Sequence, residues 1–171
     1  MLYGDAAFFG SPGTLHPSPL NNGNHYLFEG SIMAGNFFGD VDPRAAWDAL
    51  TTDDQSVLID VRTQAEWVFV GTPDLGELGR EVIKIEWQSF PGMFRNQNFV
   101  DQVMSEGLAP ERPLYLICRS GARSRQAAIL LAQHGFSTYN VADGFEGDLD
   151  ADGHRGSVSG WKVEKLPWRQ S

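Results

Sequence analysis

The chain has 171 residues, which suffices for one domain with a substantial hydrophobic core, and its 42% of hydrophobic residues is typical of a globular protein rather than a disordered one. A formal net charge of −9 argues against a protein that binds nucleic acid by neutralising phosphates. The single cysteine excludes a disulfide bond within the chain and favours a reducing compartment, and no apolar stretch approaches the roughly 20 residues of a membrane helix. These features predict a cytoplasmic protein that binds neither nucleic acid nor membranes.

Residues 1–32 differ in composition from the rest of the chain. They mix Gly, Pro, Asn and scattered aromatic residues without a sustained period, and no Lys or Arg precedes Arg44. We interpret this segment as a flexible leader, or as an extension introduced for expression, without a secretory or transit signal. The alternative is that its aromatic side chains dock on the domain. His16 and His25 have no partner at metal-ligand spacing, so we predict no metal site and no cofactor.

Residues 33–171 are predicted to form a single domain in which helices and strands alternate. Asp42 followed by Pro43 is typical of a helix start. Thr63 and Glu66 have the spacing of a capping box, which predicts a brief helix. The first half of the domain is predicted to contain a helix from residue 42, a strand at 57–59, a brief helix at 63–67, a loop at 71–79, a strand at 82–87 and a loop at 88–96.

The second half continues the alternation and ends in a tail. Gly and acidic residues gather at 144–160, which predicts a solvated loop. Trp161 and Trp168 are expected to pack the tail onto the domain, because aromatic burial would tether it. The predicted elements are a helix at 99–104, a strand at 113–117, a helix at 124–134 that ends at Gly135, and a strand at 138–141.

The alternation argues for right-handed crossovers and for a mostly parallel sheet that is covered on both faces. In such α/β sheets, ligands bind beyond the carboxyl ends of the strands. Cys118, the segment 60–62 and Trp87 each stand at the end of a predicted strand. We therefore expect these three strand ends to share one mouth.

The loop from Cys118 to Ser124 is the most informative stretch of the chain. It stands between a buried strand and a helix N-terminus, where successive backbone N–H groups can converge on one anion. These backbone dipoles, together with Arg119 and Arg123, favour the thiolate form of the cysteine, which is the nucleophilic form. The usual role of a free cysteine, that of a small buried hydrophobe, fits less well with a glycine and two arginines in the loop. The loop predicts chemistry on sulfur or phosphorus.

Four motifs resemble the single-domain rhodaneses, which form the thiosulfate sulfurtransferase family. They are Asp60-Val61-Arg62, Glu66-Trp67, the loop Cys118-Arg119-Ser120-Gly121-Ala122-Arg123-Ser124 ahead of a helix, and Gly144-Phe145-Glu146-Gly147. The resemblance covers roughly residues 40–168. It implies a three-layer α/β fold with a mostly parallel five-stranded sheet flanked by helices. It also implies a cysteine that accepts sulfane sulfur as a persulfide and passes it to a thiophile such as cyanide or a cellular thiol.

The chain departs from the family pattern in one segment near these motifs. Rhodaneses commonly follow the Glu-aromatic pair with a Gly-His-Ile-Pro-Gly-Ala run, whereas residues 71–76 of this chain are Gly-Thr-Pro-Asp-Leu-Gly. That side of the site is therefore expected to differ.

The spacing within the loop separates two chemistries. Cysteine phosphatases need five residues between the cysteine and the loop arginine, whereas four residues separate Cys118 from Arg123. The shorter loop makes a smaller cradle, which suits one sulfur atom better than a tetrahedral phosphate. The spacing therefore favours sulfur transfer over phosphate-ester or arsenate chemistry.

The remaining roles follow from this assignment. We expect Cys118 to attack the sulfane sulfur of a donor and to form a covalent intermediate, without a general-base histidine, since His134 is expected to cap a helix C-terminus. Either of the two loop arginines attracts the anionic donor, and the sequence leaves open which one. The serine hydroxyls brace the loop or cap the helix. The expected substrate-binding residues are Arg119, Ser120, Gly121, Ala122, Arg123 and Ser124.

Three residues outside the loop are assigned places near the site. Asp60 and Arg62 are predicted to form a buried pair that fixes a strand end rather than to act in catalysis. Trp87 is a candidate for the mouth of the site. The segment 90–93 could line the mouth too, although packing is the commoner role of aromatic loops.

The function predicted from the sequence is a sulfurtransferase that works through a Cys118 persulfide. Its partners would be a small-molecule donor (thiosulfate or a persulfide) and a thiol or cyanide acceptor; the sequence identifies no protein partner. The alternative is a non-catalytic module that binds a partner or senses persulfide or oxidant through the same cysteine. Calcium binding at 148–153 is a further alternative, although Ser159 stands where a calcium loop has its bidentate Glu.

Overall fold

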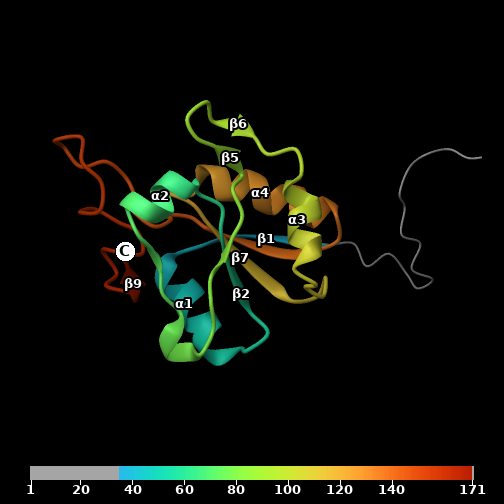
Figure 1. Cartoon of the computed structure of the whole chain (residues 1–171). Helices are drawn as coiled ribbons and strands as arrows, with labels where there is room; N and C mark the ends of the chain where they lie inside the picture. The colour runs from blue at the N-terminus through green and yellow to red at the C-terminus, as the bar shows by residue number, and fades with distance from the viewer. Residues whose placement is uncertain (1–34, 171) are drawn as a thin grey trace, which may run out of the picture. The chain divides into compact units, whose positions relative to one another are not determined.

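The computed structural model describes residues 35–170, and the expectations for residues 1–32 lie outside this part of the chain. In the described part, five parallel strands form the main sheet in the order β1-β8-β7-β2-β4 (Figure 1). The prediction of a mostly parallel five-stranded sheet is thereby confirmed. These strands are β1 (Phe37–Val41), β2 (Val57–Asp60), β4 (Ile83–Lys84), β7 (Pro113–Ile117) and β8 (Ser137–Val141).

Helices connect the strands, and two of them begin where the sequence predicts. The Asp42 carboxylate accepts a hydrogen bond from the N–H of Ala45 at 2.7 Å, and Thr63 and Glu66 form a complete capping box. None of the helices within residues 35–170 is long and apolar enough to span a bilayer. The helices are α1 (Pro43–Thr52), α2 (Gln64–Phe69), α3 (Phe99–Ser105), α4 (Ala122–Gln133) and the short 3-10 helix η1 (Gly76–Leu78).

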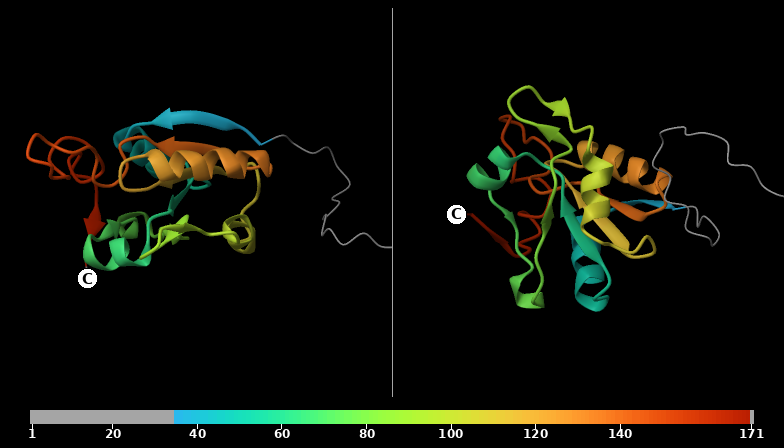
Figure 2. Two further views of the ribbon diagram at one scale, coloured as in Figure 1. Left: turned by 90° about the horizontal axis from the view of Figure 1, so that it is seen from above. Right: turned by 45° about the vertical axis from the view of Figure 1, so that its right-hand side comes forward.

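The sheet buries apolar side chains on both faces, because successive residues of a strand point in opposite directions. Ile59 of β2 belongs to a core cluster with residues of α3 and α4. Its neighbour Leu58 belongs to the cluster on the other face, with residues of α1 and with Trp161 of the C-terminal tail. Figure 2 shows the helices on the two sides of the sheet. A sheet covered in this way leaves only its strand ends open to ligands.

Short strand pairs are the elements that the sequence does not predict. The expected loop at 88–96 contains an antiparallel hairpin of β5 (Gln88–Ser89) and β6 (Phe94–Arg95). In the expected loop at 71–79, β3 (Thr72–Pro73) pairs with β9 (Trp168–Arg169) of the tail. Pairs of two residues are too short to produce a hydrophobic period. The edge strand β1 also goes unpredicted, and the strand expected at 82–87 is reduced to β4.

The C-terminal tail packs on the domain largely as expected. Trp161 is fully buried, and its indole N–H donates to the carbonyl of Pro167 at 2.8 Å. Trp168 is 40% exposed but lies edge-on against Phe145, with 6.0 Å between the ring centroids. In the acidic loop before the tail, the Asp150 carboxylate accepts hydrogen bonds from two backbone N–H groups and one hydroxyl of its own loop. Within residues 35–170, no group of three or more His, Cys, Asp or Glu is placed to hold a metal ion.

Asp60 and Arg62 form the buried pair that the sequence predicts. Both side chains are fully buried, and Nη2 of Arg62 lies 2.6 Å from a carboxylate oxygen of Asp60. The same nitrogen donates to the carbonyl of Gly71 at 2.7 Å, and the guanidinium lies 4.1 Å from the ring centroid of Phe145. The pair therefore ties the end of β2 to the segment before β3 and to the turn after β8.

Replacing Arg62 by Met leaves the Asp60 carboxylate buried without its partner, and we expect the free energy of unfolding in urea to fall by about 3–5 kcal/mol. The control is Arg44→Met, which breaks an ion pair with Glu164 whose side chains are 48% and 46% exposed. An exposed pair of this kind contributes about 0–1 kcal/mol. Equal losses for the two variants would contradict the structural role of Arg62.

Candidate functional site

The cysteine loop joins the end of β7 to the start of α4, as the sequence predicts, but α4 begins two residues earlier than expected. The reason is Gly121, which has a φ of +90° and occupies the N-cap position. A Cβ at this residue would lie 1.7 Å from the carbonyl oxygen of Ala142, so neither the conformation nor the space allows a side chain. The loop therefore turns directly into the helix behind Cys118.

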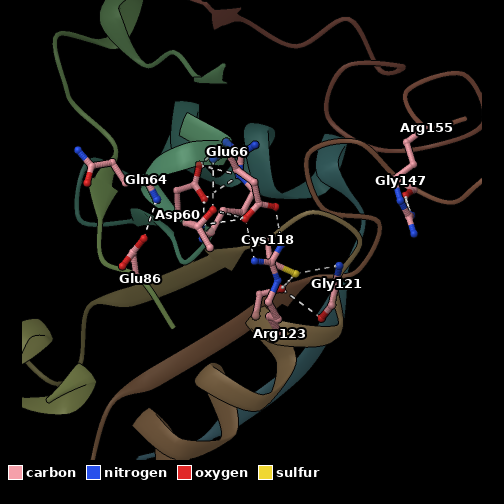
Figure 3. Close-up of polar contacts among 12 residues, drawn as sticks. Asp60, Gln64, Glu66, Glu86, Cys118, Gly121, Arg123, Gly147 and Arg155 are labelled. Carbon is pink, nitrogen blue, oxygen red and sulfur yellow. Dashed lines mark hydrogen bonds and ion pairs between the residues drawn. The ribbon is translucent and has the colours of Figure 1, made fainter. Parts of the chain in front are cut away.

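The Cys118 thiol is 1% exposed and lies at the N-terminal end of α4. The backbone N–H of Gly121 donates to its sulfur at 3.2 Å, and Ser124 Oγ also lies 3.2 Å from it (Figure 3 shows Cys118 and Gly121). Hydrogen bonds from backbone and hydroxyl groups stabilise a negative charge on sulfur. The arrangement supports a nucleophilic sulfur held by the helix N-terminus.

Ser124 connects this sulfur to a polar chain that ends on β1. Its Oγ lies 2.7 Å from Oδ1 of Asn140, and Nδ2 of Asn140 donates to Asp40 at 2.8 Å. Ser124 and Asn140 are both buried, so their hydrogen bonds compensate for the loss of water. Ser124 Oγ also lies 3.1 Å from the carbonyl oxygen of Gly121, and its single hydroxyl hydrogen can satisfy only one of these three acceptors at any moment. Ser124 therefore braces the loop from inside, which is one of the two roles that the sequence suggests for it.

The loop rests on the turn that follows β8. The N–H groups of Phe145 and Glu146 donate to the carbonyls of Cys118 and Arg119 at 2.8 and 2.9 Å. Gly144 has a φ of +62°, and a Cβ there would lie 2.5 Å from the Cys118 carbonyl oxygen. The turn and the loop are therefore in direct backbone contact, which fixes the position of the sulfur relative to β8.

The two loop arginines have different environments. Arg123 forms a bidentate ion pair with Glu66, with N–O distances of 2.6 and 2.8 Å (Figure 3). Burial alone would raise the pKa of Glu66, but the hydrogen bonds from Arg123 and Thr63 and the charge of Arg123 outweigh it and lower this pKa from 4.5 to about 2. The side chain of Arg119 is exposed and makes no hydrogen bond or ion pair within residues 35–170. Arg119 is thus the arginine available to an anion.

A cavity of about 680 Å³ opens above the sulfur, between the cysteine loop, α2 and the β5–β6 hairpin. Of the predicted loop residues, all but Gly121 and Ser124 line it, and these two lie beneath the sulfur. Other residues also line the cavity. Among them, the sequence suggests only the segment 90–93, and only as one of its two possible roles. These further lining residues are Thr63, Ala65, Glu66, Val70, Gln88, Phe90, Pro91, Met93 and Glu146.

Trp87 is not at the mouth, which corrects the place expected for it. Its side chain is 3% exposed and packs edge-on against Phe99 in the core, with 5.1 Å between the ring centroids. The backbone turns after Trp87 into the β5–β6 hairpin, so Phe90 and Met93 line the cavity instead. Asp60 and Arg62 lie behind the site, in the buried ion pair described above.

Two carboxylates of the site, Glu66 and Glu146, escape prediction for different reasons. The capping-box pattern predicts the place of Glu66 in its helix, but the ion pair with Arg123 joins residues 57 positions apart. Glu146 is part of a recognisable motif, yet only the contact between its turn and the cysteine loop brings it to the cavity. Contacts at this sequence separation leave no local pattern.

Comparisons with known proteins agree with this arrangement. The family model of the STR4 middle domain matches residues 38–171. The uncharacterized protein RC0915 of Rickettsia conorii is 35% identical over 128 residues, which cover 72% of this chain and 91% of that protein. The rhodanese-like domain-containing protein 4, chloroplastic, of Arabidopsis thaliana is 30% identical over 127 residues, which cover 72% of this chain and 24% of that protein.

Two solved structures are similar to this chain in both fold and sequence. The crystal structure of Rv0390 from M. tuberculosis has a TM-score of 0.73 and 47% identity, covering 80% of this chain and 100% of that one. The solution structure of the polysulfide-sulfur transferase homodimer from Wolinella succinogenes has a TM-score of 0.52 and 25% identity, covering 77% and 78%. The match to the family model, the parallel sheet and the cysteine loop at the carboxyl end of its central strand lead to one conclusion: the chain belongs to the rhodanese-like domain family.

Proposed function

We propose that the protein is a sulfurtransferase that carries sulfane sulfur as a persulfide on Cys118. The observation that carries the proposal is the position of the sulfur, which receives hydrogen bonds from the helix N-terminus at the base of a cavity whose rim holds Arg119, an arginine without an ion-pair partner within residues 35–170. A related protein, from Wolinella succinogenes, is described as a polysulfide-sulfur transferase, which lends further support. The single, unpaired cysteine suits a reducing compartment such as the cytoplasm.

The reaction requires a nucleophile and a place for an anion, and we assign these roles to Cys118 and Arg119. The Cys118 thiolate attacks the outer sulfur of thiosulfate, the bond between that sulfur and the sulfonate sulfur breaks, and sulfite leaves with the electron pair. In the persulfide that forms, the N–H of Gly121 donates to the inner sulfur, and the positive end of the α4 dipole favours the negative charge of the outer sulfur. A thiophile then removes the outer sulfur and restores the thiolate.

We further propose that Arg119 binds the anionic donor and that Arg123 holds the loop in position. The Glu66 carboxylate already neutralises Arg123, so that guanidinium has little net charge to offer a ligand. The cluster also ties α2 to α4, because Glu66 accepts hydrogen bonds from Arg123 and from the Thr63 cap at once. The proposal thus chooses between the two loop arginines, a choice that the sequence leaves open.

The central prediction concerns covalent loading of the cysteine. After treatment with thiosulfate, we expect the intact mass of the protein to increase by one sulfur atom, and treatment with cyanide should remove it as thiocyanate. The Cys118→Ser variant should neither gain the sulfur nor release thiocyanate above background. Equal, background-level turnover of both proteins would contradict sulfur transfer and favour the non-catalytic alternative.

Loss of Arg119 should affect donor binding more than the loop itself. We expect Arg119→Met to raise the KM for thiosulfate about 10- to 100-fold, because a hydrogen bond to a charged group contributes about 1.5–3 kcal/mol. Steady-state thiocyanate formation measures the change, and Arg44→Met, on the exposed surface of α1, serves as the charge-matched control. An unchanged KM would show that the donor is bound without this arginine.

The Glu66 ion pair predicts a pH dependence of stability. Because the pKa of Glu66 is lowered from 4.5 to about 2 in the folded protein, the pair stabilises the fold above pH 4.5 and loses this effect as the pH falls towards 2. The unfolding free energy of the wild type should exceed that of Glu66→Gln near neutral pH, and the difference should shrink over this range. Urea titrations across the range test this, with the exposed Glu77→Gln as control; a difference independent of pH would contradict it.

A further inference from the structure

One hydroxyl hydrogen beneath the sulfur has three acceptors around it. Ser124 Oγ lies 2.7 Å from Oδ1 of Asn140 and 3.1 Å from the carbonyl oxygen of Gly121. It lies 3.2 Å from the sulfur of Cys118. The sulfur also receives the N–H of Gly121, and the Gly121 carbonyl receives the N–H of Arg125 at 3.0 Å. Within residues 35–170, Oδ1 of Asn140 has no donor other than Ser124, so Asn140 depends most on this hydrogen.

The amide of Asn140 is held with its oxygen towards Ser124. Asp40 lies opposite Asn140 in the register of the parallel strands β1 and β8, and its carboxylate accepts a hydrogen bond from Nδ2 of Asn140 at 2.8 Å. An ionised carboxylate has no hydrogen to donate, so the amide nitrogen must face Asp40 and the amide oxygen must face Ser124. The side chain of Asp40 is 47% exposed and lies 3.5 Å from Nε of Arg125. Water and this cation stabilise its negative charge.

The inner part of this network lies where an unpaired polar atom is costly. Asn140 is 2% exposed and Ser124 is fully buried. If the hydroxyl hydrogen turned to the sulfur, Oδ1 of Asn140 would lose its donor, and two oxygen atoms 2.7 Å apart would face each other with lone pairs. With the hydrogen on Asn140, Ser124 turns a lone pair towards Cys118 and can accept the hydrogen of a thiol. The hydroxyl therefore stabilises the thiolate only when Asn140 gives up its donor.

We propose that Asn140, oriented by Asp40, is a positioning residue that competes with Cys118 for the Ser124 hydrogen and so restrains formation of the thiolate. A thiolate that is stabilised less is a stronger nucleophile, because nucleophilicity rises with basicity. Two opposing influences thus act on the sulfur. The helix N-terminus and the N–H of Gly121 favour the thiolate, and the Asp40–Asn140 pair keeps that thiolate reactive. The inference goes beyond the proposed sulfur transfer, since it applies to any reaction of this thiolate.

Other charged groups near the sulfur also affect its titration. They come from the cysteine loop, from α2, from the segment at the end of β2 and from the turn after β8. All of them stay unchanged in the variants described below, so differences between variants report on the hydroxyl hydrogen and on Asp40. These groups are Arg119, Arg123, Glu66, Asp60, Arg62 and Glu146.

The test is the pH profile of alkylation with iodoacetamide. Cys118 is the only cysteine of the chain and lines the cavity, so loss of free thiol reports on this sulfur alone. We expect Asn140→Leu to lower the pH of half-maximal rate by about one unit, which corresponds to a roughly tenfold effect of one buried hydrogen bond. The rate at the high-pH plateau should fall about two- to threefold, since the thiolate is better stabilised. A variant that merely loosened the loop would raise the plateau rate instead.

The same substitution is made in a Ser124→Ala background. Without the hydroxyl there is no hydrogen to compete for, so Asn140→Leu should then leave the pH profile unchanged. A shift that persists in this background would overturn the inference, because it would reach the sulfur by a route that does not pass through Ser124.

Asp40→Asn gives a second cycle with a substitution at a half-exposed position. An amide there can accept as well as donate, so the Asn140 amide is free to turn over and the hydroxyl hydrogen becomes available to the sulfur. We expect a shift in the same direction as for Asn140→Leu. Loss of the negative charge also favours the thiolate directly, but that part persists in the Ser124→Ala background, whereas the part that acts through Asn140 vanishes there. Asp48→Asn, exposed on α1, is the charge-matched control and should shift neither midpoint nor plateau.

The outcomes separate this inference from the proposed function. An unchanged midpoint in both Asn140→Leu and Asp40→Asn would overturn it, as would an Asp40→Asn shift of equal size with and without the Ser124 hydroxyl. If circular dichroism shows that Asn140→Leu does not fold, the Asp40 cycle decides alone. Alkylation needs no sulfur donor, so failure of thiosulfate to load the protein leaves the result intact, and normal loading does not rescue the inference.

Discussion

The close backbone contact between the cysteine loop and the turn after β8 is the constraint on which the rest of the site depends. Gly121 and Gly144 leave no space for a Cβ, and three N–H groups of the turn donate to the carbonyls of Cys118 and Arg119. The same contact places the sulfur at the start of α4 and brings Glu146 to the cavity. A shift of either segment would move the nucleophile and its hydrogen-bond donors together.

Some charged side chains around this contact form ion pairs within the protein, whereas others have no protein partner within residues 35–170. Arg62 neutralises Asp60 inside the domain, and Arg123 neutralises Glu66 at the edge of the cavity. Both pairs are hydrogen-bonded, so their charges are compensated where water is largely absent. Arg119 and Glu146 are the cavity residues whose charged groups lack such protein partners within residues 35–170.

The sequence predicts the features that arise from local patterns. The capping box at Thr63, the helix start at Asp42 and the buried strand before Cys118 lie where expected, because each depends on residues only a few positions apart. The resemblance of the loop to known proteins adds the five-stranded sheet. The β3–β9 pair and the Glu66–Arg123 ion pair connect distant segments, and Trp87 is turned inwards by a hairpin of two-residue strands. No period or spacing in one chain encodes such contacts.

The order of strands in the sheet also determines how late in translation the surroundings of Cys118, the only thiol of the chain, are completed. β8 lies between β1 and β7, so the first strand has no partner in the sheet until residues 137–141 have been made. The turn that supports the cysteine loop follows β8, and Trp161, which fills the core behind it, is made later still. The chain emerges from the ribosome with its N-terminus first. The cysteine loop therefore lacks the turn that supports it until residues 144–147 have been translated, and Cys118 is more open to oxidants up to that point.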